Sequence, residues 1–156
     1  YLGIAEGALT EAQTYTRRQS RAWFQSGVDS PTRDPYVLQK YGEFWVERHA
    51  ATLAADHAAR LLDAAWRRED ALTAEVRAET AIAIAAAKVL ATRAALDVTN
   101  RLFEVTGARA TTTAGGFDRF WRNIRTHSLH DPLDYKLFDL GEWALNERPP
   151  VPTFYS

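Results

Sequence analysis

Two long runs of helical periodicity, at about residues 35–66 and 73–105, constrain the fold of this chain most strongly. Along each run, apolar and small side chains recur every three to four residues, which predicts amphipathic helices. About thirty residues at 1.5 Å per residue make each helix roughly 45 Å long. Because only a short polar segment separates the two runs, they are predicted to pair as an antiparallel hairpin.

Residues at the ends of these runs are typical of helix boundaries. Asp34 and Pro35 supply an N-cap and a proline at the first helical position. Thr73 can cap the second long helix, although the glutamate of a full capping box is absent. Gly107 stands where a helix usually ends on glycine.

The rest of the chain adds shorter helices and polar loops, and no segment has strand periodicity. The sequence therefore predicts an all-α, up-and-down four-helix bundle that forms a single domain over residues 1–156. The further elements are helices at 1–18, 117–130 and 133–146, loops at 25–35 and 108–116, and an extended tail at 147–156.

Composition limits the possible classes of protein. The net charge of −1 disfavours a nucleic-acid or acidic-membrane partner. The chain has no cysteine, which excludes disulfides and thiolate chemistry, and it has no run of eighteen apolar residues. It also has no methionine and begins at Tyr1. We therefore expect it to be a fragment of a longer protein.

The segment 117–132 combines arginines, aromatic side chains and two histidines, His127 and His130. On a continuous helix, histidines three residues apart can face one cavity. Pro132 limits the helix, because proline disfavours the α conformation in the residue before it. Titratable groups at a helix end, beside cations, are typical of a reactive site.

A metal centre is not favoured. Di-iron sites in helical bundles need a Glu-x-x-His motif from each of two helices, and the sequence has none. His49 and His57 lack suitably spaced carboxylates, so we interpret them as part of a polar helix face and not as metal ligands. His127 and His130 offer two ligands without a visible third.

Arginines beside two loops are candidates for anion binding. Arg17, Arg18 and Arg21 precede the first loop, and Arg109 lies in the second. The planar guanidinium suits phosphate, but a solvated basic face with ion pairs is the stronger interpretation from the residues alone. Nearby aromatics fit core packing, a planar cofactor with a phosphate, or single-stranded nucleic acid. The net charge disfavours the last.

Four blocks of sequence carry a more specific resemblance: Tyr15–Trp23, Asp34–Leu38, Phe103–Arg109 and Gly116–Pro132. They resemble the C-terminal domain of flavin-dependent monooxygenases of the dibenzothiophene monooxygenase type, which are built on the acyl-CoA dehydrogenase fold. The resemblance covers nearly the whole chain, and the last block is its most specific part.

The resemblance implies the chemistry of a larger enzyme. Family members have an N-terminal helical domain, a middle β-domain and a C-terminal helical bundle, and they form tetramers. The chain alone is therefore expected to be inactive. A separate flavin reductase supplies reduced FMN (FMNH2), and O2 converts it to a C4a-hydroperoxyflavin that oxygenates a hydrophobic heteroaromatic or organosulfur substrate. We expect a cytoplasmic enzyme that binds neither nucleic acid nor a membrane.

The resemblance also implies roles for individual residues. Arg21 corresponds to a contact with the flavin phosphate, and Arg109 to a second contact that reaches the flavin of a neighbouring subunit. His127 and His130 correspond to the active-site pair beside the isoalloxazine. An imidazole there can donate a hydrogen bond, and then a proton, to a reacting oxygen. His130 is the stronger candidate for this role, with His127 supporting it or capping the helix.

Two other functions stay open. An acyl-CoA dehydrogenase would use FAD and a glutamate base followed by Gly-Thr, but the corresponding place here holds Asp131 and Pro132. The shorter aspartate before a rigid proline would be badly placed to reach a substrate proton. The third possibility is a non-catalytic helical oligomerisation module.

Overall fold

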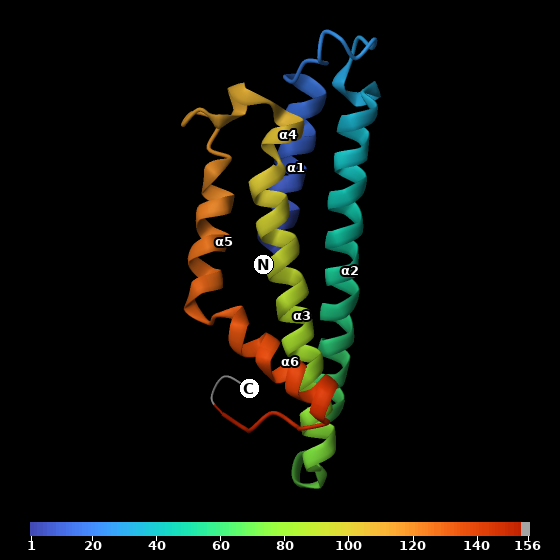
Figure 1. Ribbon diagram of the computed structural model, residues 1–156, viewed down its shortest axis with the longest axis vertical. Helices are drawn as coiled ribbons and strands as arrows, with labels where there is room; N and C mark the ends of the chain where they lie inside the picture. The colour runs from blue at the N-terminus through green and yellow to red at the C-terminus, as the bar shows by residue number, and fades with distance from the viewer. Residues whose placement is uncertain (154–156) are drawn as a thin grey trace.

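The computed structural model describes residues 1–153 and contains no strand within them, which confirms the all-α prediction. Figure 1 shows α2 and α3 running antiparallel as a long hairpin, with α1 and α5 beside its upper half. The elements in chain order are α1 (Leu2–Arg18), η1 (Pro31–Arg33), α2 (Pro35–Trp66), η2 (Glu69–Ala71), α3 (Ala74–Arg101), α4 (Phe103–Thr106), η3 (Ala108–Thr111), α5 (Asp118–His130) and α6 (Leu133–Asn146).

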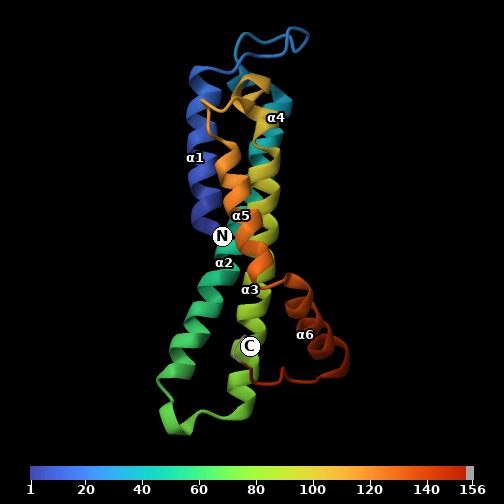
Figure 2. The same cartoon turned by 90° about the vertical axis from the view of Figure 1, so that its left-hand side faces the viewer.

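Helix α3 is the centre of the fold, because it packs against α1, α2, α5 and α6. Its buried residues are mainly alanine, valine and threonine. Such small side chains let several helices approach one axis closely. The last helix, α6, leans away from the other helices beside the lower half of α3 (Figure 2).

The hydrophobic core lies at the end of the hairpin where α1, α2, α3 and α4 meet. Its largest fully buried side chains are Phe44 and Leu102, whereas Ile124 of α5 is buried in a separate small cluster with Ala5 and Ala95. At the opposite end, the hairpin is much less covered, and Trp66 is 81% exposed. The tertiary structure therefore has one well-packed end and one open end.

The predicted helix boundaries are largely confirmed. The Asp34 carboxylate accepts hydrogen bonds from the amides of Tyr36 (2.9 Å) and Val37 (3.5 Å). The Thr73 hydroxyl accepts one from the Val76 amide (3.4 Å). Both caps satisfy amides that a helix start leaves without partners.

The prediction of one continuous helix to residue 105 was wrong, because the regular helix ends at Arg101. The Val105 amide bonds to the Leu102 carbonyl (3.2 Å), three residues back. This tighter turn interrupts the i to i−4 pattern. Gly107 then takes φ 85° and ψ 171°, a region that essentially only glycine occupies.

In the predicted extended tail, residues 148–153 form no helix or strand. It begins at Glu147, which has left-handed backbone angles. Residues 154–156 of the predicted tail lie outside the described residues. No helix within residues 1–153 is long and apolar enough to cross a bilayer.

Candidate functional site

Four residues were predicted to form the site. The structure places three of them on two separate grooves, and His127 lines neither groove. Arg21 and Arg109 line one groove of about 690 Å³, at the well-packed end of the molecule. His130 lines a second groove of about 560 Å³, at the far end of α5. The two grooves share no lining residue. Within residues 1–153, the arginines and His130 therefore line two different grooves.

The arginine groove is formed by the loop after α1 and by the turn from α4 to η3. The unusual backbone of Gly107 directs the chain into η3 and so presents Arg109. Arg109 donates a hydrogen bond to the carbonyl of Gln19 (2.6 Å). Arg21 is exposed, and in the described part of the chain no acceptor or carboxylate pairs with its guanidinium.

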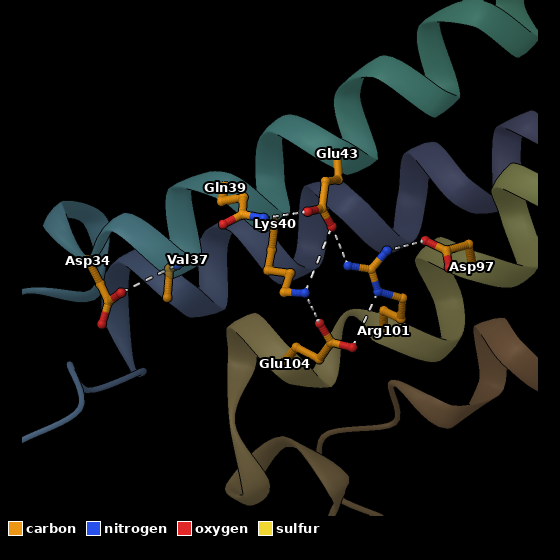
Figure 3. Close-up of polar contacts among 8 residues, drawn as sticks. All are labelled: Asp34, Val37, Gln39, Lys40, Glu43, Asp97, Arg101 and Glu104. Carbon is orange, nitrogen blue, oxygen red and sulfur yellow. Dashed lines mark hydrogen bonds and ion pairs between the residues drawn. The ribbon is translucent and has the colours of Figure 1, made fainter. Parts of the chain in front are cut away.

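A charged network lies beneath this groove, centred on Arg101 of α3 (Figure 3). Arg101 donates to the carboxylates of Glu43 (2.5 Å), Asp97 (2.9 Å) and Glu104 (3.3 Å). Lys40 forms a further ion pair with Glu104 (3.1 Å). The network ties α2 to the α3–α4 junction. It also neutralises Lys40 and Glu104, both of which line the groove.

These contacts shift the pKa of the carboxyl groups. The hydrogen bond from Arg101, with a further one from Gln39, lowers the pKa of Glu43. Burial acts to raise the pKa of Glu104, but the hydrogen bonds from Lys40 and Arg101 outweigh it, so that pKa is also lowered. Both carboxyls are therefore anionic at neutral pH. The positive character of the groove comes from Arg21 and Arg109.

His127 and His130 lie in the last turn of α5, as the periodicity predicted, but they face different neighbours. The ring of His127 packs on the ring of Tyr1, with centroids 4.6 Å apart. The Tyr1 hydroxyl donates to the His127 carbonyl (3.2 Å). The groove at His130 does not include His127. Of the two histidines, His130 therefore lines this groove and His127 does not.

The groove at His130 combines aromatic and apolar side chains with charged ones, among them Asp131, Lys136 and Asp139. Tyr135 and Phe138 contribute from α6, and Val151 contributes from the tail. Tyr135 is 71% exposed and Phe138 is 66% exposed, so large apolar surfaces stand beside an accessible imidazole. This arrangement suits a hydrophobic ligand whose reacting atom needs a proton donor.

The arginines of α5 are engaged within the chain. Arg119 pairs with Glu11 and donates to the Gly116 carbonyl (2.7 Å). Arg122 pairs with Asp118 (3.1 Å). Arg125 lies over the ring of Trp121, 5.9 Å from its centroid. Through these contacts, the three arginines of α5 contribute to the scaffold.

Sequence reasoning missed Lys88, which lies on α3 directly behind the end of α5. Its ammonium donates to the Asp131 carbonyl (3.0 Å) and pairs with the Asp131 carboxylate. Burial, together with the nearby Lys136 charge, lowers the pKa of Lys88. The available signal was a single lysine after a run of alanines on a helix with many buried residues.

The other histidines do not extend the site. His49 stacks on Trp45, with ring centroids 4.6 Å apart, and His57 is exposed on α2. In residues 1–153, no group of three His, Asp or Glu side chains is arranged to hold a metal ion.

Comparison with known proteins places this geometry in context. A family model described as "Acyl-CoA dehydrogenase, C-terminal domain" matches residues 1–135. The chain is 58% identical over 156 residues to a probable FMNH2-dependent monooxygenase, SfnC, of Pseudomonas putida. All of the chain is covered in that match, but only 40% of the relative. The chain thus spans about two fifths of the length of the curated relatives it matches.

Two solved structures have the same fold. Methanesulfinate monooxygenase MsuC from Pseudomonas fluorescens superposes with a TM-score of 0.97 at 56% identity, over 99% of this chain and 40% of that one. Dibenzothiophene monooxygenase TdsC from Paenibacillus sp. A11-2, in complex with FMN and indole, gives a TM-score of 0.96 at 47% identity. That match covers 100% of this chain and 39% of TdsC.

Proposed function

The chain belongs to the family of acyl-CoA dehydrogenase C-terminal domains, and from this premise we propose that it is the C-terminal domain of an FMNH2-dependent monooxygenase. The enzyme uses O2 to oxygenate a hydrophobic heteroaromatic or organosulfur compound. Support comes from similarity to an FMNH2-dependent monooxygenase, to a methanesulfinate monooxygenase, and to a dibenzothiophene monooxygenase solved with FMN. The proposal covers the whole enzyme, of which this chain forms the last domain.

The observation that carries the proposal is the convergence of Arg21 and Arg109 on one groove. Two guanidinium groups from distant segments, with no carboxylate pairing them in residues 1–153, fit the phosphate of FMN. Arginine binds phosphate through paired N–H donors. Because both arginines line the same groove, we assign them to the same phosphate, in place of the flavins of two subunits that the resemblance implied.

His130 is the residue that handles protons in this proposal. When bound, the reduced flavin supplies the activated oxygen. The His130 imidazole would donate a hydrogen bond, and then a proton, to a reacting oxygen. The aromatic side chains of α6 bind the substrate and exclude water. His127, held against Tyr1, supports the last turn of α5.

The dehydrogenase alternative is disfavoured by the state of Asp131. A base that removes a substrate proton must be free to reach it. The Asp131 carboxylate is paired with Lys88, and Pro132 follows it in the chain. The ion pair therefore neutralises the carboxylate and holds it in an orientation that serves the fold.

We further propose that the enzyme is a cytoplasmic homotetramer supplied with reduced flavin by a separate reductase. Large exposed apolar side chains support subunit or domain contacts. Trp45 and Leu53 on α2 are each 55% exposed, and Trp66 at the hairpin end is 81% exposed. Exposed aromatic side chains such as Trp45 and Trp66 are enriched in protein–protein interfaces.

The test is oxygenation by the full-length protein with reduced FMN, O2 and either dibenzothiophene or methanesulfinate. His130→Ala is expected to abolish product formation while FMN binding is retained. His57→Ala is the matched control, because His57 is an exposed histidine away from both grooves. Undiminished product formation by His130→Ala would contradict the assigned role. Absence of oxygenation by the wild type with both substrates would count against the function itself.

A further inference from the structure

Lys88 is a largely buried charged residue that has no role in the proposed chemistry. It follows the alanine-rich run 81–87 on α3, and its side chain is only 17% exposed. The ammonium contacts two oxygens of one residue, the carbonyl and the carboxylate of Asp131. Because a lysine is rarely buried without partners, this position is organised around Asp131.

Asp131 occupies a structurally decisive place. It is the residue directly after His130, where α5 ends, and its extended backbone (φ −134°, ψ 93°) turns the chain toward α6. Pro132 follows and precedes the first residue of α6. A cation at the C-terminal end of α5 also interacts favourably with the helix dipole. Lys88 thus fixes the corner between α5 and α6.

Further charged side chains surround this corner. Lys88 and Asp131 line a small cavity of about 150 Å³ together with Lys136 and Asp139 of α6 and Pro150 of the tail. Lys136 is 8% exposed. Two lysines and two aspartates therefore share a confined space. Moving the Lys88–Asp131 pair apart would leave charge poorly solvated, which is strongly unfavourable.

We propose that Lys88 is a positioning residue for His130. By holding the carbonyl and the carboxylate of Asp131, it fixes the last turn of α5 and directs the imidazole into its groove. The inference rests on the proposed function, in which His130 transfers a proton. Proton transfer requires the donor to lie within hydrogen-bonding distance of its acceptor. A displacement of about 1 Å can reduce a rate roughly a hundredfold.

The test compares Lys88→Met, which keeps the length of the side chain without its charge, with Lys88→Arg, which keeps the cation. In the full-length enzyme, Lys88→Met is expected to lower kcat by about ten- to a hundredfold. KM for the substrate and Kd for FMN should stay close to wild type, and Lys88→Arg should recover most of the loss. Amide hydrogen exchange over residues 128–134, measured without substrate, should be faster in Lys88→Met. Arg122→Met removes an exposed α5 ion pair and should change neither kcat nor exchange.

The outcomes separate the two proposals. Wild-type kcat in folded Lys88→Met, or an equal loss in Lys88→Met and Lys88→Arg, overturns the positioning role. If Lys88→Met does not fold, Asp131→Asn decides: lowered kcat supports the role, and unchanged kcat overturns it. A wild-type enzyme without oxygenase activity defeats the proposed function. In that case, faster exchange in Lys88→Met still supports the Lys88–Asp131 corner, and unchanged exchange refutes it.

Discussion

Removing the guanidinium of Arg101 tests whether the charged network stabilises the end of the fold that carries the arginine groove. Arg101→Met keeps an unbranched apolar side chain over the ring of Phe44, where the guanidinium carbon now lies 5.2 Å from the centroid. It removes three charge-assisted hydrogen bonds. The variant therefore separates the charge of Arg101 from its packing.

The expected loss follows from the burial of Arg101. Exposed ion pairs contribute about 0–1 kcal/mol, whereas breaking a buried pair costs about 3–5 kcal/mol. The Arg101 side chain is 19% exposed and its partners are more exposed, so an intermediate loss of about 2 kcal/mol is expected. For a chain of this size, that corresponds to a fall in Tm of about 4–8 °C.

The loss should also depend on pH. The pKa values of Glu43 and Glu104 are lowered in the folded state. Their stabilising contribution is therefore present above the unfolded pKa of about 4.3 and is lost as pH falls through the lower folded values. The deficit of Arg101→Met should be full at pH 7 and should shrink below about pH 4.3.

Urea unfolding of the 156-residue chain, followed by circular dichroism at several pH values, measures this deficit. Arg33→Met is the control, because the Arg33–Asp29 pair (3.0 Å) is 68% and 79% exposed, and it should change stability by less than about 0.5 kcal/mol. A deficit for Arg101→Met that is equal at pH 7 and pH 3.5 would show that packing, not charge, is responsible. A deficit no larger than that of Arg33→Met would refute the stabilising role of the network.

Three further predictions concern the core and the arginine groove. Thr92 is fully buried, and its hydroxyl lacks a partner within the described residues, so Thr92→Val should raise the free energy of unfolding by about 1 kcal/mol. Thr99→Val is the control: it loses a hydrogen bond to the Ala95 carbonyl (2.7 Å) and should lower the free energy of unfolding. Equal effects of the two substitutions in urea unfolding would contradict this prediction. Leu102→Ala empties a fully buried position and should cost about 2–5 kcal/mol by the same assay, whereas a loss below about 1 kcal/mol would mean that the core refills the space. Arg21→Ala and Arg109→Ala should each weaken FMN binding to the full-length protein about tenfold or more, measured by titration, and unchanged affinity in both would remove the groove from the FMN site.

Local features of the sequence were reliable guides to the helices. The caps at Asp34 and Thr73 and the glycine at 107 were predictable, because each acts on backbone groups within a few residues. The break at Leu102 was missed, because a single three-residue turn leaves the apolar periodicity almost unchanged. Periodicity reports which face is buried and does not report the hydrogen bonding of each residue.

The candidate site was only partly predictable. The resemblance pointed to Arg21, Arg109, His127 and His130, and the structure shows where each one lies. It did not point to Lys88, because nothing near this lysine in sequence indicates an ionic partner. The Lys88–Asp131 contact joins residues 43 apart in the chain.

By itself, the sequence determined the helical class and the places where most helices begin and end. It also determined which arginines and histidines are present to form a site. Tertiary structure alone decided which of these side chains meet. Arg101 reaches Glu43 across 58 residues, and Tyr1 meets His127 across 126. Such pairings depend on the angle and axial offset at which helices pack around α3, and many residues far apart in sequence set that packing together.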